Sequence, residues 1–158
     1  MTPQHQQIID KVRHCVELGN RLYGVNLPVP HISFNLKGRV AGWAQAKMGY
    51  GGYQYTVRFN HDMIVRGDKE VFDDMLNDTV PHEIAHLFCF LKPQLGRNHN
   101  DGWRRVCIAL GGTGGRAPQE VGAEAARQFG LGGEGGQGKL ARDPEDLLVD
   151  LPEEAVLV

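Results

Sequence analysis

Residues 68–92 read DKEVFDDMLNDTVPHEIAHLFCFLK, and the fold depends on the pattern in this stretch. Its apolar side chains recur at the three- and four-residue spacings of one helix face. They are Val71, Phe72, Met75, Leu76, Val80, Ile84, Leu87 and Phe88. The spacing predicts helix. Pro81 interrupts the pattern, so it either lies in the first turn of a helix capped by Asp78 or Thr79 or kinks a longer helix.

The same stretch contains an HExxH motif that runs from His82 to His86. Residues four apart on a helix lie on the same face, so the two imidazoles can bind one metal ion, with Zn–N distances of about 2.0–2.1 Å. Glu83 follows the first of these histidines, which suits a general base that takes a proton from water. The pattern therefore predicts zinc-dependent peptide hydrolysis. The alternative is a pair of surface histidines on an amphipathic helix.

A catalytic zinc site needs a third protein ligand, and four downstream residues are candidates. His99 is preferred, because it follows a glycine-containing loop and precedes a predicted helix in which Trp103 could anchor it. Glu120 or Glu124 would instead complete a site with two histidines and one glutamate. Asp101 could cap the helix that it begins or orient a liganding histidine.

The remaining segments predict an α+β domain. A helix is expected from Pro3 to about Gly24, with Ile8, Val12, Val16 and Leu22 on one face. Three strands, mostly antiparallel, are expected within residues 31–37, 40–47 and 53–60. Further helices are expected from Asp101 and over residues 118–129. Residues 53–60 are expected to form an edge of the sheet that binds substrate backbone, with a purely structural strand as the alternative.

Length and charge indicate one domain followed by a tail. The chain has 158 residues, of which 41% are apolar and 23% charged, which excludes collagen-like and wholly disordered classes. Six of the nine residues 130–138 are glycine. We predict a catalytic domain over residues 1–129 and a glycine-rich linker with an acidic tail over 130–158. The tail is expected to bind a partner or the domain itself, with a passive tail as the alternative.

Cysteine usage and hydropathy bear on localisation. Cys15, Cys89 and Cys107 are odd in number and form no CxxC pair, which favours a reducing compartment. The chain offers no apolar stretch of membrane-spanning length, and its N-terminus lacks the apolar core of a secretory signal. A cytoplasmic protein without membrane association is expected.

Several motifs together resemble one family. VPHEIAHLF at residues 80–88, the 13-residue step from His86 to His99, Trp103, AGWA at residues 41–44 and VRFN at residues 57–60 resemble the SprT-like zinc metalloprotease domain, which includes the Spartan proteases. The resemblance extends over residues 4–112. It implies a minimal zincin-like fold, in which His82, His86 and His99 bind one zinc ion and Glu83 is the catalytic acid and base.

The resemblance also implies partners. The substrate would be a protein or peptide, and because Spartan-type members cleave proteins crosslinked to DNA, DNA is a possible partner by family analogy only. Many bacterial relatives continue into a zinc ribbon with paired cysteines, and the absence of CxxC predicts a single zinc ion here. The alternative function is a catalytically idle zinc-binding domain that binds other proteins or nucleic acid.

Overall fold

The structure is a computed structural model that describes residues 1–115. The predicted helix at residues 118–129, and the linker and tail at residues 130–158, lie outside the described residues. The described elements confirm the predicted α+β class. In chain order they are α1 (Pro3–Tyr23), β1 (His31–Leu36), β2 (Gly42–Gly49), β3 (Gly52–Asn60), α2 (His61–Arg66), α3 (Lys69–Asp74), a π-helical turn (Met75–Thr79), α4 (Val80–Leu91), a 3-10 turn (Pro93–Leu95) and α5 (Asp101–Ala109).

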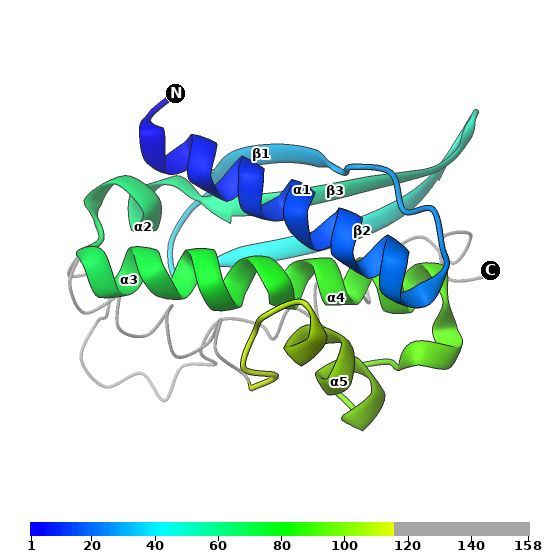
Figure 1. Ribbon diagram of the computed structural model, residues 1–158. Coiled ribbons are helices and arrows are strands. Elements are labelled where there is room, and N and C mark those ends of the chain that lie inside the picture. Colours follow the sequence, from blue (N-terminus) through cyan, green and yellow to red (C-terminus); the bar gives the residue numbers. More distant parts are fainter. Residues whose placement is uncertain (116–158) are drawn as a thin grey trace, which may run out of the picture.

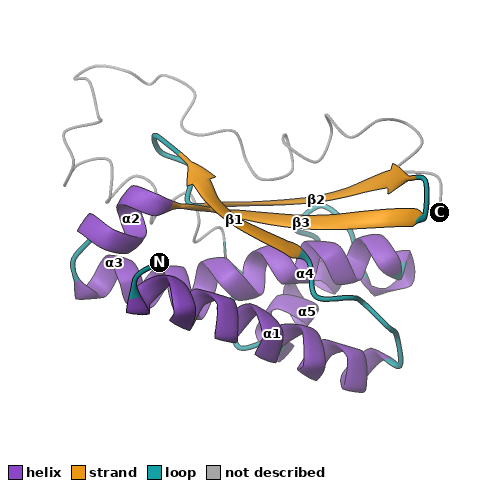
Figure 2. Ribbon diagram, turned by 90° about the horizontal axis from the view of Figure 1, so that it is seen from above, coloured by secondary structure: helices purple, strands orange, loops and turns teal. Residues whose placement is uncertain are grey.

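Helix α4 is the centre of this arrangement. It contacts β2 on one side, α1 on another and α5 on a third. The helices lie on one side of the sheet, as Figures 1 and 2 show. All of residues 80–89 are consequently buried. None of the described helices is both long and apolar enough to cross a membrane.

The sheet is mixed, with strand order β1-β3-β2. Strand β2 pairs antiparallel with β3, whereas β1 pairs parallel with β3, so the expectation of a mostly antiparallel sheet holds for one of the two pairings. The expectation that residues 53–60 form an edge is wrong, because they belong to the central strand. The backbone of β3 lies between both neighbours from Thr56 to Asn60 and cannot accept an added peptide there, whereas residues 52–55 pair only with β2. The edges are β1 and β2.

Helix α1 follows its predicted pattern closely. Thr2 caps its N-terminus, and Gly24 ends it with φ of 62°, a left-handed conformation that suits glycine. Ile8, Val12 and Val16 are buried as predicted, whereas Leu22 is 53% exposed. Gly19 brings α1 against α4, because a β-carbon there would lie 2.2 Å from the ring of Phe88.

Pro81 lies within a longer helical stretch, which decides between the two alternatives. Residues 69–91 run as α3, the π-helical turn and α4, and Thr79 has helical dihedrals without a capping side chain. Proline lacks an N–H group, and its ring clashes with the carbonyl four residues earlier in a regular helix. The wider π turn directly precedes it, with Val80 N–H donating to Met75 O. The short helix α2, which begins after the capping residue Asn60, was not predicted.

All three cysteines are buried and free. Burial raises the pKa of Cys15 to about 11 and the pKa of both Cys89 and Cys107 to about 12. An unfolded thiol ionises near pH 8.5, so ionisation above that pH favours the unfolded chain and stability falls as pH rises toward 11.

We predict that a chromogenic aromatic disulfide, which reacts with accessible thiolates, modifies none of the three cysteines in the folded protein at pH 8. In the unfolded chain the thiols are exposed and a substantial fraction is thiolate, so all three should react. The absorbance change of the reagent measures the number of modified cysteines at each urea concentration, and circular dichroism measures the unfolded fraction in the same samples. Modification of any cysteine before the unfolding transition would contradict the burial described here.

Candidate metal centre

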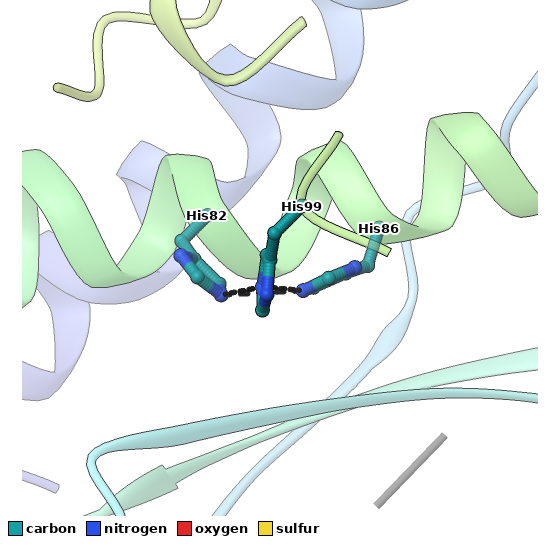
Figure 3. Close-up of side chains that lie close together, drawn as sticks. All are labelled: His82, His86 and His99. Atoms are coloured by element: carbon teal, nitrogen blue, oxygen red, sulfur yellow. Dashed lines mark hydrogen bonds between the residues drawn. The ribbon is translucent and has the colours of Figure 1, made fainter. Parts of the chain in front are cut away.

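Three histidine side chains converge beside α4. His82 and His86 lie one turn apart on α4, and His99 comes from the loop between the 3-10 turn and α5. The Nε2 atoms of His82 and His86 are 3.2 Å apart, and the Nε2 atom of His99 is 3.0 Å from each of them. Figure 3 shows the three rings pointing at one another. The three ligands that the resemblance implied are therefore brought together, within reach of a single ion.

Hydrogen bonding alone does not account for this triangle of nitrogens. A neutral imidazole nitrogen carries either a proton or a lone pair, so three mutually close Nε2 atoms cannot all be satisfied by one another. Tetrahedral zinc with Zn–N distances of about 2.0–2.1 Å separates its nitrogen ligands by about 3.3 Å. The observed separations of 3.0–3.2 Å are close to that value. The donor set and its spacing fit a zinc ion.

The environment keeps these rings in the form that binds metal. His82 is 1% exposed and His86 is 5% exposed. Burial, the largest cause, and the charge of the neighbouring histidines hold the pKa of both well below the usual 6.5. Both rings are therefore neutral at pH 7, and each has a lone pair available for a cation.

A strained turn brings His99 back toward α4. Asn98 and His99 have φ of 51° and 53°, a left-handed conformation that is uncommon for residues other than glycine. The side chain of Asn100 accepts from the backbone N–H of both Arg97 and Trp103, at 3.0 Å each, and so caps α5. This local structure determines where the His99 ring lies.

Trp103 forms the common wall behind the three rings. It is 1% exposed, and its ring centroid lies 4.6 Å from His82, 5.3 Å from His86 and 4.4 Å from His99. The contact with His99 confirms the expectation that Trp103 anchors this histidine. Because the indole touches every ring of the cluster, it restricts the orientation of all three.

Glu83 lies next to His82 in the chain and is fully buried. It faces β2, since a β-carbon added to Gly42 would lie 2.8 Å from Glu83 Oε1 and 2.7 Å from Thr79 Cγ2. Sequence reasoning did not identify Gly42 as part of this site. The available signal was a glycine inside a predicted strand, which marks a close approach of another group. Burial of a carboxylate is costly, and a cation held by the neighbouring histidines would offset that cost.

The other sequence candidates do not join this cluster. Asp101 is exposed, and Asn100 rather than Asp101 caps α5. Glu120 and Glu124 lie outside the described residues. The other histidines have packing or surface positions. His5 is buried and accepts from Thr2 N–H, whereas His14, His31 and His61 are exposed.

Known proteins similar to this chain support one family. The SprT-like family model matches residues 12–123. A protein named Protein SprT from Shewanella oneidensis is 31% identical over 105 residues, which cover 66% of this chain and 61% of that protein. Proteins of the same name from Vibrio atlanticus and Yersinia enterocolitica are 26% and 29% identical, over 66% and 63% of this chain and 57% and 52% of their own length.

The chain thus spans between half and two thirds of the length of these curated relatives. No solved structure matches it. The family model covers well over half of the chain and includes α4, the His99 loop and α5. The chain belongs to the SprT-like family.

Proposed function

We propose that this protein is a zinc-dependent endopeptidase. The observation that carries the proposal is the convergence of three imidazoles beside a fully buried glutamate that follows the first of them in the chain. A structural zinc site normally has four protein ligands, whereas a catalytic site has three and keeps one position open. Among the described residues, the cluster contains three histidines and no fourth ligand.

The residues have distinct roles in this proposal. His82, His86 and His99 would hold the ion, which when bound supplies Lewis acidity that activates water and polarises the scissile carbonyl. Glu83 accepts a proton from the attacking water as the water oxygen bonds to the carbonyl carbon. Glu83 then donates that proton to the amine nitrogen as the C–N bond breaks. The backbone of β2 at Gly42 limits the space available to the Glu83 side chain.

The exposed edge of the sheet suggests how substrate binds. Strand β2 is an edge strand, and its outer side pairs with no other described strand. It contacts α4, and Gly42 at its start lies against Glu83. A peptide added to this edge would run past the catalytic residue while its main chain donates to and accepts from β2. This assignment rests on the proposed peptidase activity.

DNA-associated proteins are the substrate class that the family resemblance suggests. The charge distribution agrees with this class, because residues 18–61, which include the whole sheet, contain five basic residues and no acidic residue. A sheet whose strands contain no acidic side chain suits an approach to phosphate groups.

Loss of one ligand should abolish zinc binding. His99→Ala removes one of three nitrogens, so the purified variant is expected to contain far less than one zinc ion per chain, against about one for the wild type. His14→Ala, which replaces an exposed histidine on α1, is the control and should retain wild-type zinc. Atomic absorption of dialysed protein measures this. A wild type without zinc, or a fully loaded His99→Ala variant, would refute the assigned ligands.

Replacement of Glu83 should separate catalysis from metal binding. Glu83→Gln keeps the shape of the side chain but cannot accept the proton, so cleavage is expected to fall about 10²- to 10⁴-fold while zinc content stays near one. The assay uses an unfolded protein and a protein bound to single-stranded DNA. Equal cleavage by wild type and variant would remove Glu83 from the mechanism, and no cleavage by the zinc-loaded wild type would favour the catalytically idle alternative. Faster cleavage of the DNA-bound substrate would support DNA-associated targets, and no preference would contradict them.

Strand addition at β2 predicts a periodic effect of substrate backbone changes. In an added strand only every second N–H faces β2, so N-methylation scanned along a peptide that the enzyme cleaves should lower kcat/KM at alternate positions, by about tenfold each. Alanine replacement at the same positions is the control for side-chain effects. A loss without two-residue periodicity would exclude this binding mode.

A further inference from the structure

The glycine-rich loop after α5 lies against the beginning of α4. This loop, residues 111–115, has the sequence GGTGG, and from sequence it serves only to end α5. Its Gly112 N–H donates to Cys107 O at 2.9 Å. A β-carbon on Gly112 would lie 2.7 Å from Cys107 Sγ and 3.1 Å from Pro81 Cβ. The loop is therefore packed onto the residue that precedes the first histidine of the cluster.

A buried carboxylate holds this loop in place. Asp78, in the π-helical turn, is only 7% exposed. Its Oδ1 accepts from the backbone N–H of Thr113 at 2.9 Å and from the Thr113 hydroxyl at 3.0 Å, and its Oδ2 lies 3.2 Å from the same hydroxyl. Hydrogen bonds to a charged acceptor are stronger than neutral ones. The bridge between Asp78 and Thr113 thus joins two segments that are 35 residues apart in the chain.

The bridge continues from Thr113 toward His82. Thr113 Oγ1 accepts from Gly115 N–H at 3.2 Å, so the position of Gly115 depends on the Thr113 side chain. Asp78 and His82 are four residues apart in one helical stretch, and the loop spans the turn between them. The backbone of Gly115 lies near the His82 ring, where it acts to raise the pKa of His82 against the larger effect of burial, but it makes no hydrogen bond to Nδ1.

The remaining nitrogen of His82 is the group that this contact would control. Its Nε2 faces His86 and His99, and its Nδ1 is buried without a hydrogen bond to any described residue. Metal-binding histidines are usually oriented through the second ring nitrogen, which donates to a carboxylate or a backbone carbonyl. A loop fixed next to that nitrogen can therefore set the angle of the ring.

We propose that Asp78 and Thr113 are positioning residues for the metal site. Their hydrogen-bonded bridge holds residues 111–115 against α4 and so keeps the His82 ring in the orientation in which Nε2 meets the other two histidines. The π-helical turn contributes to this bridge. Such a turn inserts one extra residue into the helix and so changes the side of the helix that Asp78 faces. The inference rests on the proposed metal site and does not depend on peptidase activity.

The test compares zinc affinity and stability in matched variants. Thr113→Val removes the hydroxyl and is expected to weaken zinc binding about 10- to 100-fold, the usual effect of removing a group that supports a ligand. Thr113→Ser keeps the hydroxyl and should restore affinity to within about twofold of wild type. Thr2→Val, which removes a hydroxyl that caps α1, is the control and should leave zinc affinity unchanged.

Competition with a chromophoric chelator measures the affinities, and thermal unfolding of the metal-free proteins records stability separately. The visible absorption of the cobalt-substituted Thr113→Val variant should also differ from that of wild type, since a reoriented ring changes the ligand field. If Thr113→Val does not fold, Asp78→Asn takes its place, with weaker zinc binding expected again.

Wild-type zinc affinity in the folded Thr113→Val variant, or in Asp78→Asn when it is the variant used, would overturn the positioning role. So would an equal loss of affinity in Thr2→Val, because the effect would then reflect general stability. A wild type that binds no zinc would overturn the proposed metal site, and this inference with it.

Discussion

Desolvation of the polar face of α4 is the constraint that the rest of this structure must satisfy. The helix is covered by β2, α1 and α5, yet it carries His82, Glu83 and His86 at exposures of 1%, 0% and 5%. Buried groups of this kind are costly unless they find partners or a cation. The same burial keeps the imidazoles neutral and so makes them effective ligands. Stability and metal chemistry therefore depend on one environment, and each surrounding element contributes something to it.

The close approach of these elements depends on missing side chains as much as on apolar contacts. Gly19 lets α1 reach the ring of Phe88, and Gly42 lets β2 reach Glu83. On the α5 side, a β-carbon on Gly112 would lie 3.1 Å from Pro81 Cβ. Gly42 thus touches a side chain of the site directly, whereas Gly19 and Gly112 fix the packing of α4 on either side of it.

The His99 loop shows how local chemistry and long-range packing combine. Asn100 is a strong helix-capping residue, and its position predicts where α5 begins. The left-handed turn at Asn98 and His99 is less favourable by itself. The left-handed turn is maintained by the contact of His99 with Trp103, which also touches both histidines of α4. His99 thus reaches His86, 13 residues earlier in the chain, only when α5 packs on α4.

The sequence by itself determined the helical character of residues 68–92, the α+β class and the three histidines that converge. These follow from periodicity and spacing along one helix, together with a family resemblance for His99, and need little knowledge of distant contacts. Only the tertiary structure decided that β3 is the central strand, that Pro81 lies within a continuous helical stretch behind a π turn, and that Asp78 reaches Thr113. Strand order and side-chain bridges join residues far apart in the chain, and alternation or spacing within one segment contains no information about which distant segment it will meet.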